Sequence, residues 1–180
     1  MTFTQLARRV REHLGQEHRY AHSVRVARYA ELLAKRHGVD TRRARHAGLL
    51  HDLARLYTPA QLIAESEARG FAIDTVEREH PVLLHARLGA ALARERFGVT
   101  DAAVLSAIEK HTRGAHEMSP LDCVVYLADS LEPARRFPER ESLWQLAQHD
   151  LEGATRETLE LSRRRQERKA AQAEARASAS

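Results

Sequence analysis

The chain has 180 residues, of which 43% are hydrophobic and 30% charged, a composition ordinary for one globular domain large enough to bury a core. Its single cysteine, Cys123, excludes an internal disulfide framework and favours a reducing, cytoplasmic location. The most apolar short run, residues 123–128, is far below the ~20 residues needed to cross a bilayer, and the first residues lack a secretory pattern. We therefore expect no membrane partner.

The basic character of the sequence, with a pI of 9.6, is a property of one end of the chain. Residues 163–180 carry six basic and two acidic side chains, which accounts for the whole formal charge of +4 and leaves 23 basic and 23 acidic residues in 1–162. This distribution argues against nucleic-acid binding except through the tail. We predict one domain over residues 1–162 and a basic Ala/Arg/Ser-rich tail over 163–180, which is either a helix extension or disordered.

Helix-forming residues dominate the whole chain, and alternation with β-branched residues is nearly absent. Taken in order, apolar spacing, capping residues and Gly or Pro stops predict helices over about 2–14, 19–37, 41–51, 59–70, 82–97, 101–111, 120–130 and 140–170. Residues 71–81 are predicted to be a connecting loop, and residues 131–138 a proline-bounded break. The predicted fold class is all-α, a single helical bundle.

Polar residues interrupt the apolar stripes of five of these helices. They are His22, His51, His85, His111 and Asp129, and Asp52 directly follows His51. A polar side chain on a buried face must be hydrogen-bonded, paired in ionised form, or bound to metal. One such histidine is most simply a satisfied core residue, but five such polar positions on separate helices favour a shared metal centre in the bundle. Imidazole and carboxylate without cysteine suit a hydrolytic site for borderline or hard divalent cations.

This order of residues resembles the HD-domain superfamily of metal-dependent phosphohydrolases. The matching segments are residues 18–22, 48–55, 84–86, 110–112 and 126–133. The stretch Glu132-Pro133-x-Arg135-x-Phe137-Pro138 makes the chain more similar to the YqeK family of symmetrical bis(5'-nucleosyl)-tetraphosphatases, and the resemblance covers about residues 18–150. Departures are Arg55, where lysine is common, Leu84, where an aromatic residue is common, and the end beyond about residue 163, which matches nothing.

The resemblance implies that residues 1–162 form an HD domain that cleaves diadenosine tetraphosphate and related dinucleoside tetraphosphates into two ADP. Six ligands are too many for one tetrahedral ion and fit two octahedral ions. By resemblance, Asp52 would bridge the two metals, with His22, His51 and Asp129 completing one ion and His85 and His111 the other. The resemblance implies iron, although Mn²⁺, Co²⁺ or Ni²⁺ would also suit these ligands.

Two metals held ~3.5–4 Å apart can activate a bridging hydroxide for in-line attack on a central phosphorus. Asp52 and His111 are the predicted catalytic residues. Because the polyphosphate is anionic, arginine forks should bind it. The candidates for substrate binding, each weighed against an ordinary surface role, are Arg55, Arg135, Arg19, Thr112 and His80.

Two alternatives stay open at this point. The first is another HD-type nucleotide phosphohydrolase, such as a nucleotidase or a guanosine alarmone hydrolase. The second is a non-enzymatic regulator that binds RNA or ribosomes through the basic tail, although a pure binding module has no need for two metals. The oligomeric state and the choice between adenine and guanine dinucleotides do not follow from the sequence.

Overall fold

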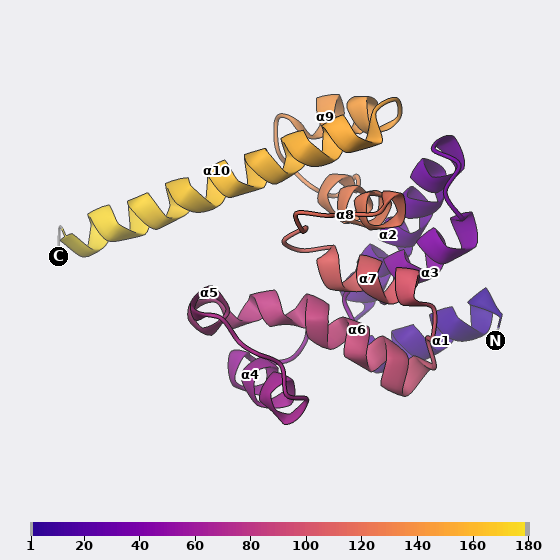
Figure 1. Cartoon of the computed structure of the whole chain (residues 1–180), viewed down its shortest axis with the longest axis horizontal. Helices are drawn as coiled ribbons and strands as arrows, with labels where there is room; N and C mark the ends of the chain where they lie inside the picture. Colours follow the sequence, from indigo (N-terminus) through magenta and orange to yellow (C-terminus); the bar gives the residue numbers. More distant parts are fainter. Residues whose placement is uncertain (1, 179–180) are drawn as a thin grey trace.

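A computed structural model describes residues 2–178 of the chain, and this part contains helices but no strand (Figure 1). The predicted all-α class is therefore confirmed. The elements in chain order are α1 (Phe3–Leu14), α2 (Glu17–Arg36), α3 (Thr41–Leu50), α4 (Pro59–Ala68), α5 (Thr75–Glu79), the 3₁₀ turn η1 (Pro81–Leu83), α6 (Leu84–Phe97), α7 (Ala102–Lys110), α8 (Pro120–Leu131), α9 (Arg140–Ala147) and α10 (Leu151–Ser178).

Capping residues account for most of the helix starts. The side chains of Thr58 and Ser119 accept hydrogen bonds from the backbone three residues on, and a proline follows each of them at the first helical position. Asp40 and Asp101 cap α3 and α7 in the same way without the proline. These caps satisfy backbone N–H groups that the helix itself leaves without a partner, so the sequence sets where these helices begin.

Helices α2, α3, α6, α7 and α8 pack around one apolar core, with α2 lying directly against α3 (Figure 1). Gly48 makes the close approach of α2 and α3 possible, because a Cβ atom at this position would lie 2.9 Å from the Cα of Ala27. Leu50, Leu88, Ile108 and other wholly buried apolar side chains fill the space between these helices. The polar residues of the candidate site lie on these same helices or directly after them.

Two predictions of secondary structure were wrong. The expected loop over 71–81 contains α5 and runs into η1, because Asp74 and Glu77 form a reciprocal capping box that starts a short helix. The single helix expected over 140–170 is broken between Ala147 and Leu151. There the side chain of Asp150 accepts a hydrogen bond from the N–H of Gly153 at 2.8 Å, which starts α10 as a new helix.

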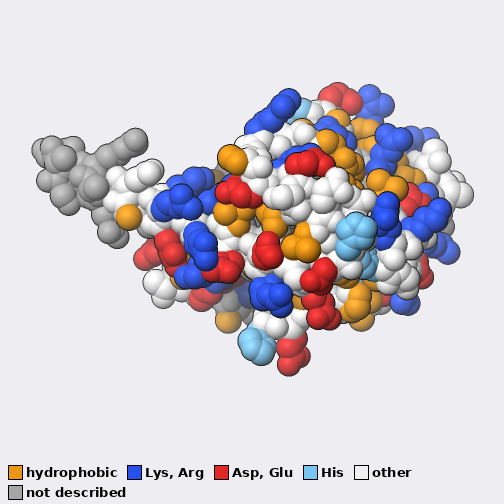
Figure 2. Space-filling model, turned by 90° about the horizontal axis from the view of Figure 1, so that it is seen from above, with side chains coloured by type: hydrophobic (Ala, Val, Ile, Leu, Met, Phe, Trp, Pro, Cys, Tyr) orange, Lys and Arg blue, Asp and Glu red, His pale blue; other side chains and the backbone are white. Residues whose placement is uncertain are grey.

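Helix α10 packs on α8 and α9 through its first part and then extends away from the other helices (Figure 1). Basic and acidic side chains are intermixed on the exposed surface (Figure 2), and α10 has ion pairs between Arg164 and Glu160 and between Arg163 and Glu167. Across residues 2–178, none of the helices combines the length and the apolar character that crossing a membrane requires.

Candidate metal centre

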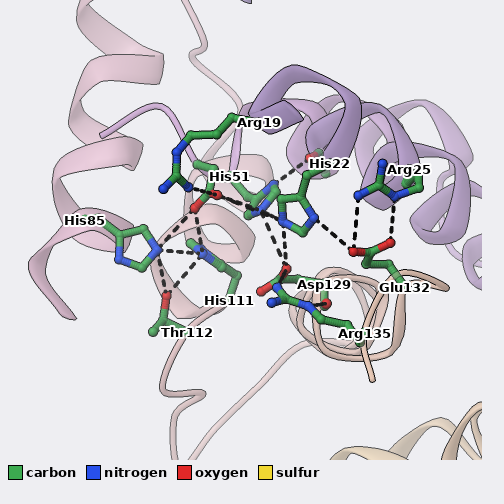
Figure 3. Close-up of polar contacts among 12 residues, drawn as sticks. Arg19, His22, Arg25, His51, His85, His111, Thr112, Asp129, Glu132 and Arg135 are labelled. Atoms are coloured by element: carbon green, nitrogen blue, oxygen red, sulfur yellow. Dashed lines mark hydrogen bonds and ion pairs between the residues drawn. The ribbon is translucent and has the colours of Figure 1, made fainter. Parts of the chain in front are cut away.

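The predicted ligands come together from five helices at one place in the core (Figure 3). His22 lies on α2, His85 in the first turn of α6 and Asp129 near the end of α8. His51 and His111 are the residues directly after α3 and α7, and their backbones keep the right-handed helical conformation. Each of these two side chains therefore continues the inward stripe of its helix, as the apolar spacing predicted.

Three of the histidines are anchored by the same local contact. The Nδ1 atoms of His51, His85 and His111 each lie 2.5–2.8 Å from the carbonyl oxygen three residues earlier, which belongs to Gly48, Val82 and Ile108 respectively. His51 and His111 stand at helix C-termini, where such carbonyls lack an intrahelical partner, so each ring can donate its Nδ1–H to one of them. His85 reaches the carbonyl of Val82 in the 3₁₀ turn that precedes α6. The Nε2 atom of each ring then carries the lone pair and faces the centre.

One group of ligand atoms is formed by His22, His51 and Asp129. The Nε2 of His22 lies 3.2 Å from the Nε2 of His51 and 3.1 Å from an Oδ atom of Asp129, and His51 is 3.8 Å from the same oxygen. Donor atoms bound to one ion at about 2.1 Å lie about 3.0 Å apart when adjacent and about 4.2 Å apart when opposite. The observed separations fall in that interval, so this group fits one cation.

His85 and His111 form a second group, with their Nε2 atoms 3.1 Å apart. Asp52 lies between the two groups. Its Oδ1 is 3.3 Å from His85 and 4.0 Å from His111, whereas its Oδ2 is 3.8–3.9 Å from His22 and His51. One carboxylate oxygen thus faces each group, which is the arrangement expected of a bridging ligand. The ligand atoms of His51, Asp52 and His111 also lie within 4.8 Å of one another, so the two groups adjoin.

Burial and neighbouring charges favour the protonation states that a metal needs at four of these side chains. At His22 burial opposes protonation, but Asp129 outweighs it and raises the pKa. Burial lowers the pKa of His51, and burial together with repulsion from His51 and His85 lowers the pKa of His111 to about 3. Burial opposes ionisation of Asp52 and Asp129, but the surrounding histidines outweigh it and hold both carboxyl pKa values below their usual range. Neutral imidazoles and ionised carboxylates are the forms that bind divalent cations.

A cavity of about 500 Å³ opens onto the ligands and is lined by basic side chains. Of the predicted substrate-binding residues, Arg19, Arg55, Thr112 and Arg135 line this cavity. Arg135 reaches an Oδ atom of Asp129 at 2.5 Å, Arg19 lies 3.9 Å from Asp52, and the Thr112 hydroxyl lies 3.2 Å from His85 Nε2. His80 does not line the cavity, because it is the exposed residue between α5 and η1.

Further lining residues escaped the sequence analysis. His18 and Arg25 both line the cavity, and their offsets of four and three residues from His22 could have indicated this. Tyr126 and Ser130 share the inner surface of α8 with Asp129. Ser162 could not be found from local spacing, because its position depends on how α10 packs against α8.

Comparison with known proteins gives a consistent family assignment. The HD domain family model matches residues 19–134, which is more than half of the chain. A symmetrical bis(5'-nucleosyl)-tetraphosphatase of Bacillus subtilis is 38% identical over 141 residues, covering 77% of this chain and 74% of the relative. The protein of the same name from Halalkalibacterium halodurans is 37% identical over 150 residues, covering 81% of this chain and 76% of the relative.

A solved structure agrees with these sequence matches. A crystal structure of a protein from Clostridium acetobutylicum, described as an HD superfamily hydrolase involved in NAD metabolism, superposes with a TM-score of 0.80 at 34% identity and covers 86% of this chain and 81% of the other. Residues 19–134, which the HD domain family model matches, contain all six predicted ligands. The chain therefore belongs to the HD domain family and, within it, to the YqeK family, whose relatives from Bacillus subtilis and Halalkalibacterium halodurans are named symmetrical bis(5'-nucleosyl)-tetraphosphatases.

Proposed function

We propose that this protein is a hydrolase that cleaves diadenosine tetraphosphate and related dinucleoside tetraphosphates symmetrically into two ADP. The observation that carries this proposal is the position of Asp52, whose two oxygens face two separate ligand groups at the bottom of an arginine-lined cavity. The names of the relatives from Bacillus subtilis and Halalkalibacterium halodurans point to the same reaction. With its single buried cysteine, the protein is proposed to act in the cytoplasm.

The proposed cofactor is two divalent ions. His22, His51 and Asp129 would hold one ion, His85 and His111 the other, and Asp52 both. Iron is the metal implied by the family, and Mn²⁺, Co²⁺ or Ni²⁺ suit the same ligands. Such a pair, when bound, supplies Lewis-acid activation of water and neutralises charge on the phosphate under attack.

The chain's own side chains would position the polyphosphate. Arg19, Arg55 and Arg135 surround the mouth of the centre, and each presents a charged fork that suits phosphate oxygens. Thr112 beside His85 offers one hydroxyl donor close to the same place. ADP is a stabilised leaving group, so the reaction needs no strong general acid from the protein. The position of the substrate's central phosphates relative to these arginines would then decide which bond is cut.

The family assignment favours this proposal over another type of HD nucleotide hydrolase. The RNA-binding alternative receives less support, because Arg163 and Arg164, in the basic segment, are each paired with a glutamate four residues away on α10. The first alternative remains an outcome of the test below.

Product analysis tests the proposal. The metal-loaded protein is incubated with diadenosine tetraphosphate, and the nucleotides are separated by chromatography. ADP as the sole product is the expected result, and Asp52→Asn should remove it, whereas Asp150→Asn at the start of α10, away from the ligands, should not. ATP plus AMP would contradict the proposed position of the substrate. Absence of turnover, with turnover of a nucleoside monophosphate or a guanosine alarmone, would favour the first alternative.

A further inference from the structure

The four histidines of the centre do not have equivalent outer partners. The Nδ1 atoms of His51, His85 and His111, which point away from the centre, each face a neutral backbone carbonyl. His22 differs, because its Nδ1 lies 3.3 Å from Oε1 of Glu132 (Figure 3). Within the described chain it is the one histidine of the four whose ring is backed by a carboxylate. An ionised partner draws the Nδ1 proton more strongly than a carbonyl does and makes the other nitrogen a better donor to metal.

The local sequence explains how Glu132 reaches this position. Helix α8 ends at Leu131, and Pro133 disfavours the helical conformation for the residue before it. Glu132 is accordingly extended, with φ −58° and ψ 150°. Asp129 and Glu132, three residues apart, then contact the two nitrogens of the same ring, Asp129 at Nε2 and Glu132 at Nδ1. His22 is therefore held between one carboxylate on α8 and one directly after it.

Arg25 holds Glu132 in place. It lies three residues after His22 on α2, and its Nε donates to Oε2 of Glu132 at 2.7 Å. The backbone N–H of Ala134 donates to the same oxygen at 2.9 Å. Glu132 is only 2% exposed, and a carboxylate buried to that degree requires such charged and hydrogen-bonded partners. Both oxygens of Glu132 therefore have partners, Oε1 with His22 and Oε2 with Arg25 and Ala134. Glu132 thus supports a metal ligand without being one itself.

We propose that Glu132, fixed by Arg25, is a positioning residue that orients His22 and makes the ion at the group of His22, His51 and Asp129 the more tightly held of the two. This inference rests on the proposed binuclear centre and adds to it an asymmetry between the ions. The group of His85 and His111 has only carbonyl anchors and depends less on any outer side chain. The role of Glu132 is therefore selective for one ion.

Calorimetric titration of the full-length, metal-stripped protein with Co²⁺ tests this selectivity. Two binding events are expected for the unaltered protein, and His85→Ala should identify the event that belongs to His85 and His111. Glu132→Gln preserves the size of the side chain but removes its charge. It should weaken the other event about 10- to 100-fold, the effect typical of losing such a partner, and leave the His85 event within about twofold. Glu132→Asp keeps the carboxylate and should recover part of the loss.

Glu77→Gln is the matched control, because Glu77 is also a buried glutamate near an arginine, Arg87, but lies away from the ligands. It should change neither event. Arg25→Met should weaken the same event as Glu132→Gln, and it keeps the inference falsifiable if Glu132→Gln fails to fold. Wild-type affinities for both events in Glu132→Gln, or equal weakening of both events in Glu132→Gln and Glu77→Gln, would overturn it. Failure of the unaltered protein to bind any Co²⁺ would instead overturn the metal centre itself, and this inference with it.

Discussion

The contact between α2 and α3 at Gly48 allows a perturbation that reaches the metal centre without touching a ligand. In Gly48→Ala the new Cβ would lie 2.9 Å from Ala27 Cα, 3.0 Å from Ala27 N and 3.1 Å from Val26 C, whereas ordinary contacts begin at 3.4 Å. All three atoms are backbone, so no side-chain rotation relieves the clash. The two helices must separate by about 0.5 Å to restore normal contact.

That displacement is large on the scale of a metal site. His22 lies on α2 and His51 follows α3, so separating the helices moves two ligands of one group apart, and productive metal–ligand distances tolerate only about 0.2 Å. Overpacking typically costs about 1–3 kcal/mol, and replacing glycine by alanine in a helix offsets about 1 kcal/mol of this. The net loss is then about 0–2 kcal/mol, which corresponds to a melting temperature lower by up to about 8 °C.

The assay is a thermal melt and a Co²⁺ titration of Gly48→Ala beside Gly153→Ala. A Cβ at Gly153 meets the flexible side chain of Asp150, which caps α10 away from the ligands. Losing this cap costs about 1 kcal/mol and replacing a helical glycine by alanine offsets about as much, so this control should keep both its stability and its metal affinity. Adding Ala27→Gly to Gly48→Ala should not restore metal binding, because the clash is with backbone atoms. Unchanged Co²⁺ affinity in Gly48→Ala would refute the reasoning.

Further predictions concern the ligands, the substrate, the cysteine and the tail. Asp52→Ala and His111→Ala should each abolish turnover and lower the bound metal per chain, as measured by elemental analysis; full activity in either variant would remove that residue from the site. Arg135→Ala should lower kcat/KM about 10- to 100-fold, as expected for one charged hydrogen bond of about 1.5–3 kcal/mol, with Arg135→Lys intermediate; an unchanged kcat/KM would exclude a phosphate contact. Burial raises the pKa of Cys123, so an aromatic disulfide reagent at pH 8 should label it slowly in the folded protein and rapidly in denaturant; rapid labelling of both would contradict its burial. Truncation after Arg163 should leave the helical circular-dichroism signal of the core, because the buried part of α10 that the structure describes precedes the cut; a collapsed signal would place the tail within the fold.

The features predicted correctly from sequence depend on short-range chemistry. A cap such as Thr58-Pro59 or Ser119-Pro120 acts within four residues, so the starts of α4 and α8 could be read directly. The helical class follows from residue propensities along the whole chain, and the family assignment follows from the spacing of the histidines and aspartates. Periodicity also selected the six polar residues that the structure brings together, because each of them interrupts or adjoins an apolar stripe.

The failures arise where one element is too short or where tertiary packing decides. Helix α5 has five residues, which is too few to show a periodic stripe, although the capping box at Asp74 was visible in the sequence. Glu132 appeared in the sequence only as part of a family motif, and its contact with His22 depends on the placement of α8 against α2. His80 was a predicted substrate-binding residue in a loop beside Pro81, and in the structure it is exposed and does not line the cavity.

Anomalous diffraction from crystals of the metal-loaded protein tests the binuclear centre most directly. Data collected at the absorption edge of the bound metal should show two peaks, one beside His22, His51 and Asp129 and one beside His85 and His111, with Asp52 contacting both. A single peak, or two peaks that do not share Asp52, would contradict the binuclear centre on which the proposed reaction rests.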